Sequence, residues 1–376
     1  MNVLTYYNFI FQGEPEDIII IVKSGTKINQ LFDEYFKRMH KSNLMLKNLD
    51  NIYFIIDTKI LKNKNEETIE SFFKNNISST FLVKVVNGKS HNYNNYQIKK
   101  LIKGNIYSSV YEAQINGLNT SVAIKKINKE KIKELIMEEN ISLEIKEEDF
   151  IPKIRDFNKE IQNMQKCQCE NSVKIYDYYD TEKEFIIIME LCDETLYHLL
   201  CGKENERGFK SKEIKYILLQ LNKVFKKMNY YNISHRDIKL NNILIKYLNP
   251  EKTKYKVLLS DFGSSDQLYN NKEFFEEYIG TQLIMAPEIL DAQKYNNKCD
   301  LWSLGVIIYQ LYTKKYPYEG NVNKAILNQI EEKGISVLNA IEDNDMLLKD
   351  LLSKLLQKEP NKRISWEDYY KHPFFN

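Results

Sequence analysis

The stretch HRDIKLNNILI, from His235 to Ile245, gathers acidic, basic and amide side chains within a few residues. Asp237 is followed two positions later by Lys239 and five positions later by Asn242. A carboxylate can accept a proton, an ammonium group can stabilise negative charge, and an amide oxygen can bind a hard cation. The combination indicates a catalytic site that can accept a proton, stabilise negative charge and bind a cation.

Two further stretches carry chemistry of a similar kind. LLSDFGSS, from Leu258 to Ser265, has a strand pattern that ends at Asp261, an oxygen ligand suited to Mg²⁺, and Gly263 permits a backbone turn. SVAIKK places Lys125 at the end of a β-rich segment. Each stretch alone has an ordinary interpretation, as a turn or as an edge strand. Only the order and spacing of the stretches together indicate a common site.

Taken together, these motifs resemble the eukaryotic protein kinase family from about residue 97 to the end of the chain. The resemblance implies a bilobal α+β fold with a small β-rich N-lobe and a large helical C-lobe. It also implies ATP and Mg²⁺ as cofactors and a protein as substrate. By this resemblance Asp237 accepts the proton of the attacking hydroxyl, and Asn242 and Asp261 bind the metal.

The resemblance assigns two lysines to the phosphates. Lys125 contacts the α- and β-phosphates, and Lys239 stabilises the transferring phosphoryl group. A lysine at position 239, and Thr281 ahead of MAPEIL (Met285 to Leu290), are typical of serine/threonine kinases. The expected enzyme is therefore a serine/threonine protein kinase.

The adenine pocket is assigned in the same way. FIIIMELCDETLYHLL, from Phe185 to Leu200, combines an apolar strand with a polar connector, as a hinge between two lobes would. Met189 guards the back of the pocket, and the backbones of Glu190 and Cys192 bond the adenine edge. The ring is expected to lie between apolar side chains, which are Leu244 on one side and Val110 and Ala123 on the other.

FNKEIQNM, from Phe157 to Met164, fits a helix that offers Glu160 to Lys125 as a salt-bridge partner. The two residues are 35 positions apart, longer than the family usually shows, and residues 128–155 are expected to include an additional helix. Competing acidic residues lie in that insertion: Glu138, Glu139, Glu144 and Glu147. Met164 is expected to stack internally with Phe262 and His235.

The later motifs complete the resemblance. Asp300, which opens DLWSLGVIIYQL, is the expected anchor of the catalytic loop, and Arg363 is the expected partner of Glu288. The chain ends at HPFF, where the last helix of the fold normally ends, so no regulatory tail is expected.

Arg236 raises a question of regulation, because an arginine at this place often pairs with a phosphorylated residue of the activation segment. From Asp266 to Gly280 the sequence has no Ser or Thr. It does contain acidic residues, which are Glu273, Glu276 and Glu277. Our hypothesis is that one of these carboxylates replaces the phosphate. The alternative is that all of them are solvated loop charges.

IKGNIYSSVYEA, from Ile102 to Ala113, occupies the place of the family's glycine-rich loop but has one glycine. At the three positions where the family has glycine, this chain has Lys103, Asn105 and Ser108. Its one glycine, Gly104, is displaced by one position. Asn tolerates left-handed backbone and Ser is small. We expect a raised KM for ATP, with partial recovery in the Asn105→Gly, Ser108→Gly double variant.

The N-terminal segment has a separate pattern. Strands are expected at Phe9 to Phe11, Ile18 to Val22, Ile52 to Ile56, Lys59 to Leu61 and Phe81 to Val86, and a helix from Thr26 to Met39. The order resembles the β-grasp fold of ubiquitin-like domains. We expect this domain over residues 1–89, a linker over 90–96 and the kinase domain over 97–376, with lobes at about 97–189 and 193–376. The N-terminal domain either docks a protein partner or braces its neighbour.

Composition narrows the remaining classes of function. With 54 basic and 52 acidic residues the formal charge is +2, so no global field attracts nucleic acid. The five cysteines have neither metal-site nor disulfide spacing, and no early apolar run is long enough to span a membrane. We expect a soluble, cytoplasmic protein, with the nucleus left open. A pseudokinase scaffold is the alternative, although Lys125, Asp237, Asn242 and Asp261 are all intact.

Overall fold

The computed structural model describes the following residues of the chain: 6–12, 18–23, 30, 52–56, 59–62, 80–87, 96–115, 120–132, 134, 150–203, 208–268, 273–342 and 345–376. The chain divides into two compact units. The first comprises Met1–Ile127 and Tyr176–Ile188, and the second comprises Asn128–Ile175 and Met189–Asn376. In the described part of the chain, no helix has both the length and the apolar character needed to cross a bilayer.

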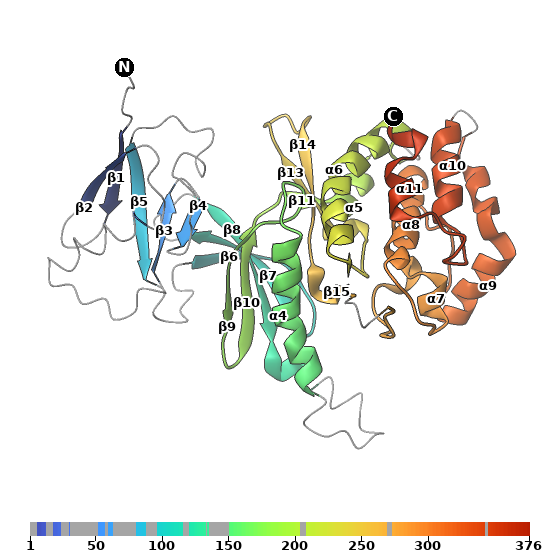
Figure 1. The fold of residues 1–376 in the computed structure, drawn as a ribbon, viewed down its shortest axis with the longest axis horizontal. Coiled ribbons are helices and arrows are strands. Elements are labelled where there is room, and N and C mark those ends of the chain that lie inside the picture. The colour runs from blue at the N-terminus through green and yellow to red at the C-terminus, as the bar shows by residue number, and fades with distance from the viewer. Residues whose placement is uncertain are drawn as a thin grey trace. The chain divides into compact units, whose positions relative to one another are not determined.

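The N-terminal strands form one five-stranded sheet in the order β2-β1-β5-β3-β4 (Figure 1). Their bounds are β1 (Tyr6–Gln12), β2 (Ile18–Lys23), β3 (Ile52–Ile56), β4 (Lys59–Lys62) and β5 (Thr80–Asn87). β1 pairs with β5 in parallel, and the other pairs are antiparallel. All five predicted strands are confirmed. The predicted helix from Thr26 to Met39 lies outside the described residues, except for Gln30, which is helical.

A second five-stranded sheet of the first unit has the order β6-β7-β8-β10-β9. Its strands are β6 (Tyr96–Gly104), β7 (Ser108–Ile115), β8 (Ser121–Asn128), β9 (Ile175–Asp180) and β10 (Glu184–Glu190). Alternate residues of β7 and β8 face a small core that also holds Ile186 and Ile188. Tyr96, placed by the sequence in the linker, begins β6 instead, because its ring packs into this core.

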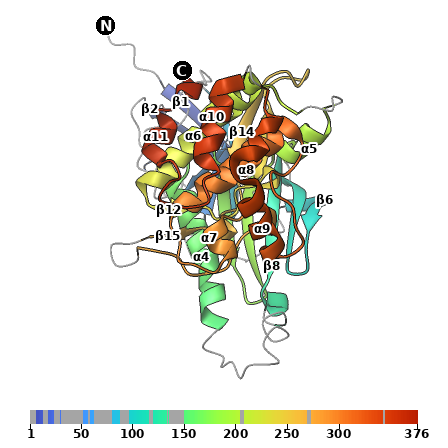
Figure 2. The same ribbon diagram turned by 90° about the vertical axis from the view of Figure 1, so that its right-hand side faces the viewer.

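The second unit is largely helical. Its α-helices are α4 (Phe150–Lys166), α5 (Leu196–Cys201), α6 (Ser211–Tyr230), α7 (Pro287–Leu290), α8 (Lys298–Thr313), α9 (Asn323–Lys333), α10 (Met346–Leu355) and α11 (Trp366–Tyr370). Residues 129–132 and 134 are also helical, in line with the additional helix expected in the insertion. Both views show α8 among α6, α10 and α11 (Figures 1 and 2).

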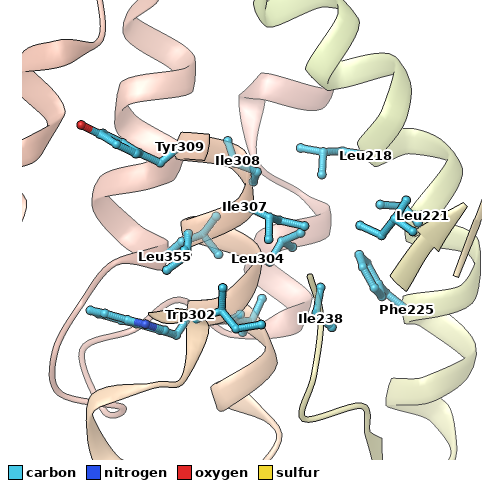
Figure 3. Close-up of a cluster of buried hydrophobic side chains, with 14 of the residues drawn as sticks. Leu218, Leu221, Phe225, Ile238, Trp302, Leu304, Ile307, Ile308, Tyr309 and Leu355 are labelled. Atoms are coloured by element: carbon cyan, nitrogen blue, oxygen red, sulfur yellow. The ribbon is translucent and has the colours of Figure 1, made fainter. Parts of the chain in front are cut away.

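Helix α8 forms the centre of the core of the second unit. It is buried on every side over Cys299 to Leu311, as expected for a helix whose apolar residues cover its whole circumference. Leu304 and Ile307 lie between the α6 side chains and Leu355 of α10 (Figure 3). Gly305 permits this close approach, since a Cβ there would come within 2.9 Å of the Leu355 side chain. The helix is therefore a fixed platform for the loops attached to it.

Two small sheets hold the chemically active loops in place. β11 (Glu194–Thr195), β13 (Ile243–Tyr247) and β14 (Tyr255–Leu259) form one, and β12 (Ile233–Ser234) and β15 (Asp266–Gln267) form the other. The remaining short helices are 3₁₀ turns: η4 (Leu240–Asn242), η5 (Phe262–Ser264), η6 (Gln282–Ile284), η7 (Gly334–Ala340) and η9 (Pro373–Phe375). Because Ile243 pairs with Leu259, Asn242 and Asp261 extend from the same end of the β13–β14 hairpin.

Candidate active site

The loop after β12 is anchored to α8 by one buried carboxylate. Asp300 accepts hydrogen bonds from the backbone N–H groups of His235 and Arg236, both at 2.8 Å. Burial raises the pKa of Asp300, while His235 and the two N–H groups act in the opposite direction. Arg236 has the left-handed backbone φ of 65°, which is unusual for a side chain of this size. The predicted anchoring role of Asp300 is confirmed.

Asp237 lies at the centre of a bonded group of side chains. Its Oδ1 accepts a hydrogen bond from the Thr281 hydroxyl at 2.7 Å. Its Oδ2 accepts one from the Asn242 amide at 3.0 Å and lies 2.7 Å from the Lys239 ammonium. Lys239 also donates to the Thr281 hydroxyl at 2.8 Å. The structure therefore brings together three predicted catalytic residues with Thr281.

The Asp261 segment is held against this loop through Ser260. The carbonyl of Asn242 accepts hydrogen bonds from the backbone N–H and the hydroxyl of Ser260, at 2.9 and 2.8 Å. The imidazole Nε2 of His235 lies 3.1 Å from the Ser260 carbonyl oxygen. Asp261 follows in left-handed backbone, with φ 64° and ψ 71°. Strain of this kind is typical of functional positions.

The side chains of Asn242 and Asp261 suit a hard divalent cation. The amide nitrogen of Asn242 donates to both the carbonyl and the carboxylate of Asp237, at 3.0 Å each. This fixes the amide orientation, so its oxygen is the atom turned away from Asp237. An amide oxygen and a carboxylate are the ligands that Mg²⁺ prefers. In the part of the chain described, no group of three or more His, Cys, Asp or Glu residues could hold a metal alone.

The predicted internal stack is present in its described contacts. The rings of His235 and Phe262 have their centroids 4.9 Å apart. Met164 and Phe262 are both buried in the same hydrophobic cluster. Helix α4 is thereby packed against the segment that begins at Asp261.

Three residues predicted for the ATP pocket share one face of the β6–β10 sheet. Val110 pairs directly with Lys125 across β7 and β8, and paired residues point to the same face. Ala123 lies two residues before Lys125, so it shares that face as well. Lys103 is paired with Val110 from the other side.

The tip of the β6–β7 hairpin is closed by an asparagine side chain. The Asn105 side-chain oxygen accepts hydrogen bonds from the backbone N–H groups of Tyr107 and Ser108, at 3.1 and 2.7 Å. The Asn105 N–H donates to the Ser108 carbonyl at 2.7 Å. Neither Asn105 nor Gly104 is among the described residues with positive φ. Asn105 therefore replaces a glycine by capping the turn, and left-handed backbone is not involved.

Comparison with known families identifies the fold that holds these groups. A family model described as protein kinase domain matches residues 96–375. The chain belongs to the protein kinase family. Its strands β6–β10 belong to the β-sheet N-lobe of that family, and its helices from α5 onward to the helical C-lobe.

Several curated relatives of this kinase are named serine/threonine-protein kinases. It is 30% identical to kinase TIO of Arabidopsis thaliana over 59% of this chain and 16% of that protein. It is 33% identical to pakG of Dictyostelium discoideum over 71% of this chain and 20% of that protein. A protein from Dictyostelium discoideum named probable myosin light chain kinase is 27% identical over 82% of this chain and 91% of its own length. The kinase spans a small share of the first two proteins.

The residues predicted for the hinge lie at and after the end of β10. The N–H of Glu190 donates to the Lys174 carbonyl at 2.9 Å. The Glu190 carboxylate bonds to Lys246. Burial raises the pKa of the Cys192 thiol to about 12, so the thiol stays neutral. Met189 and Leu244 are half-buried.

Glu160 lies on α4 and is buried. Lys125 belongs to the first unit and Glu160 to the second, so the salt bridge between them stays a prediction. The competing residues Glu138, Glu139, Glu144 and Glu147 lie outside the described residues.

Sequence reasoning missed how α4 is tied to the segment after Phe262. Asn163 donates to the Ser265 hydroxyl at 3.0 Å, in a buried position. Lys159 forms an ion pair with Asp266 at 2.7 Å, and Lys166 donates to Gln267 at 2.6 Å. The three α4 residues recur at helical spacing and contact three consecutive residues. The spacing of polar residues on α4 was the available signal, but the sequence does not say which segment they face.

The predicted pair of Glu288 and Arg363 is confirmed. The Arg363 guanidinium donates two hydrogen bonds to the Glu288 carboxylate, at 2.7 and 2.9 Å, and both groups are buried. A parallel pair of charged hydrogen bonds is a strong and directional contact. It joins α7 to the turn before α11.

Proposed function

We propose that the chain is an ATP-dependent serine/threonine protein kinase that transfers the γ-phosphate of ATP to hydroxyl groups of a protein. The observation that carries the proposal is the bonded group around Asp237, in which Lys239, Asn242 and Thr281 all contact one carboxylate. Three contacts hold the carboxylate in one orientation before a substrate arrives. Preorganisation of this kind lowers the cost of reaching the transition state.

Asp237 accepts the proton of the substrate hydroxyl as the hydroxyl oxygen attacks the γ-phosphorus. A bond forms between that oxygen and phosphorus, the bond from phosphorus to the β–γ bridging oxygen breaks, and ADP leaves. Lys239 stabilises negative charge on the transferring group, since its ammonium already lies beside Asp237. Mg²⁺, held by Asn242 and Asp261, would neutralise phosphate charge.

We assign the ATP pocket to the residues that the family resemblance implies. Lys125 contacts the phosphates and is paired with Glu160, and Asp261 holds the metal. The phosphate loop is formed by Lys103, Gly104 and Asn105. The adenine is enclosed by Val110, Ala123, Met189, Glu190, Cys192 and Leu244. Support comes from the shared sheet face of Val110, Ala123 and Lys125.

The test is transfer of labelled γ-phosphate to a generic basic protein in Mg²⁺. We expect transfer by the wild-type chain and none by Asp237→Asn, which keeps the shape but removes the proton acceptor. Thermal unfolding of both proteins provides the control for folding. Equal transfer by the two proteins would refute the catalytic role, and a chain that binds partners without transferring phosphate would be a scaffold.

We also propose that residues 1–89 form a ubiquitin-like β-grasp domain, joined by a linker that ends before Tyr96 to the kinase domain. The strand order β2-β1-β5-β3-β4, with β1 and β5 parallel between antiparallel neighbours, supports this fold. We assign the domain a docking role toward a protein partner. Bracing of the kinase domain is the competing role.

A further inference from the structure

Arg236 carries a buried positive charge directly beside the proposed catalytic aspartate. Its side chain is 6% exposed. The guanidinium donates to the Ser264 carbonyl at 2.6 Å, to the Tyr295 hydroxyl at 3.3 Å and to the Glu277 carboxylate at 3.0 Å. A buried guanidinium needs an anionic partner, because desolvation is costly for an unpaired charge. Glu277, whose side chain is 51% exposed, supplies such a partner from the activation segment, and the buried Asp266 is a second negative charge that acts on Arg236.

The part of the activation segment around Glu277 is docked by its backbone. Phe275 and Tyr295 exchange two backbone hydrogen bonds, at 2.7 and 3.0 Å. The Tyr295 hydroxyl donates to the Glu277 carbonyl at 2.8 Å, so Tyr295 contacts both members of the ion pair. The Arg236 guanidinium also lies 5.0 Å from the centre of the Phe275 ring, which is buried.

The same segment continues from Glu277 to the proposed catalytic aspartate. Gly280 has φ 122°, and a Cβ there would approach the Arg236 carbonyl to 2.6 Å, so only glycine fits. The next residue is Thr281, whose hydroxyl bonds Asp237. The ion pair and the catalytic contact are thus four residues apart along one docked stretch. Loss of the ion pair should loosen the end that carries Thr281.

Glu277 is distinguished from the neighbouring acidic residue by its partner. Glu276 pairs with Lys294 at 2.7 Å, and these side chains are 67% and 69% exposed. An exposed pair of this kind contributes little. The hydroxyl residues between Asp266 and Gly280 are Tyr269 and Tyr278 alone. Tyr278 is exposed and its hydroxyl donates to Asn323 at 2.9 Å, away from Arg236.

We propose that Glu277 is a positioning residue that holds the activation segment in its working conformation through Arg236, without phosphorylation. The inference rests on the proposed kinase activity. Glu277 does not touch the reacting atoms; it acts on Asp237 through the Arg236 backbone and through Thr281. The kinase is accordingly active without phosphorylation of this segment.

The experiment uses the full chain with labelled ATP, Mg²⁺ and a generic basic protein. We expect Glu277→Gln to lower kcat roughly tenfold, as loss of a charged hydrogen bond would, with little change in the KM for ATP. Glu277→Asp should recover part of the loss because it keeps the charge. Glu276→Gln is the matched control and should behave as wild type. Phosphatase treatment of the wild-type chain should leave its activity unchanged.

A second arm tests whether Glu277 acts through Arg236. In an Arg236→Ala background, Glu277→Gln should cause no further loss, because the partner is already absent. Equal kcat in Glu277→Gln and wild type, a full additional loss in the Arg236→Ala background, or inactivation by phosphatase would each overturn the inference alone. If wild type transferred no more phosphate than Asp237→Asn, the proposed function would fail together with this inference.

Discussion

At the scale of single residues, Asp237 illustrates what the sequence can and cannot predict. Lys239 and Asn242 lie within five positions of Asp237, so a short motif is enough to assign them to one site. Thr281 lies 44 positions away and contacts the same carboxylate. That contact depends on how the activation segment folds back, which no local pattern records. The Arg236–Glu277 pair was similarly one of several possible pairs until the structure placed Glu277 against the guanidinium.

The phosphate loop gives a prediction at the same scale. The sequence treats Asn105 and Ser108 alike as mild replacements of glycine, whereas the structure separates them. Ser108→Gly should lower the KM for ATP, because it lets the backbone approach the phosphates. Asn105→Gly should raise the KM, because it removes two hydrogen bonds that close the turn. Steady-state kinetics at varied ATP concentration measures both effects.

The two single variants also decide the behaviour of the double variant. Partial recovery of ATP affinity is expected only if the gain from Ser108→Gly exceeds the loss from Asn105→Gly. A lower KM in Asn105→Gly alone would contradict the capping role of this side chain.

At the scale of elements, the sequence from Phe157 to Met164 predicts α4 correctly as a helix, but it does not predict where the helix begins or which segments the helix contacts. Apolar residues at helical spacing identify the part from Phe157 to Met164, and the helix in fact begins at Phe150. Phe150 and Ile154 continue the same stripe at helical spacing, so the sequence did contain a signal for the earlier start. The partners of α4 are η5 and β15, elements of three and two residues, which are too short for any pattern to reveal.

The buried contact between α4 and the segment after Phe262 should contribute to stability. Asn163→Ala removes the hydrogen bond to the Ser265 hydroxyl, and we expect the free energy of unfolding to fall by about 1–3 kcal/mol. Urea unfolding followed by circular dichroism measures the loss. Lys223→Ala, which breaks an exposed pair with Glu170, is the control and should change stability by less than about 1 kcal/mol. Similar losses for the two variants would count against a specific role for Asn163.

For the pair of Glu288 and Arg363, a single substitution should lower the free energy of unfolding more than a double substitution does. Arg363→Met leaves a buried carboxylate unpaired, and we expect a loss of about 3–5 kcal/mol. The double variant Arg363→Met, Glu288→Gln should recover part of this, because no buried charge remains alone. Denaturant unfolding of the three proteins gives the comparison. A single variant within about 1 kcal/mol of wild type would show that the carboxylate finds another partner or is neutralised.

At the scale of the whole molecule, the sequence separates an N-terminal sheet from a kinase domain but does not predict the compact units. The predicted lobes, at about 97–189 and 193–376, stay a prediction; the compact units group α4 with the second unit and Tyr176–Ile188 with the first. The reason is physical. Met164 and Cys167 are buried in the cluster that surrounds α8, and the polar face of α4 bonds to residues 265–267. Contacts between distant segments decide this, and sequence order does not.

Deletion of residues 1–89 tests the role assigned to the N-terminal domain. If the domain docks a partner, the remaining chain should transfer phosphate to a generic basic protein at the wild-type rate, with an unchanged melting temperature. A lowered melting temperature together with slower transfer would indicate that the domain braces its neighbour instead. Differential scanning fluorimetry and the labelled-phosphate assay give the two readings.

The central claim is that the site formed by Asp237 and the side chains hydrogen-bonded to it transfers phosphate to Ser and Thr side chains of a substrate protein. It is tested most directly by mass spectrometry of an acceptor protein that contains Ser, Thr and Tyr, after incubation with ATP, Mg²⁺ and either wild type or Asp237→Asn. The account predicts phosphoserine or phosphothreonine with the wild-type chain and no phosphorylated residue with Asp237→Asn. Phosphotyrosine alone, or the same phosphorylated residues with both proteins, would contradict it.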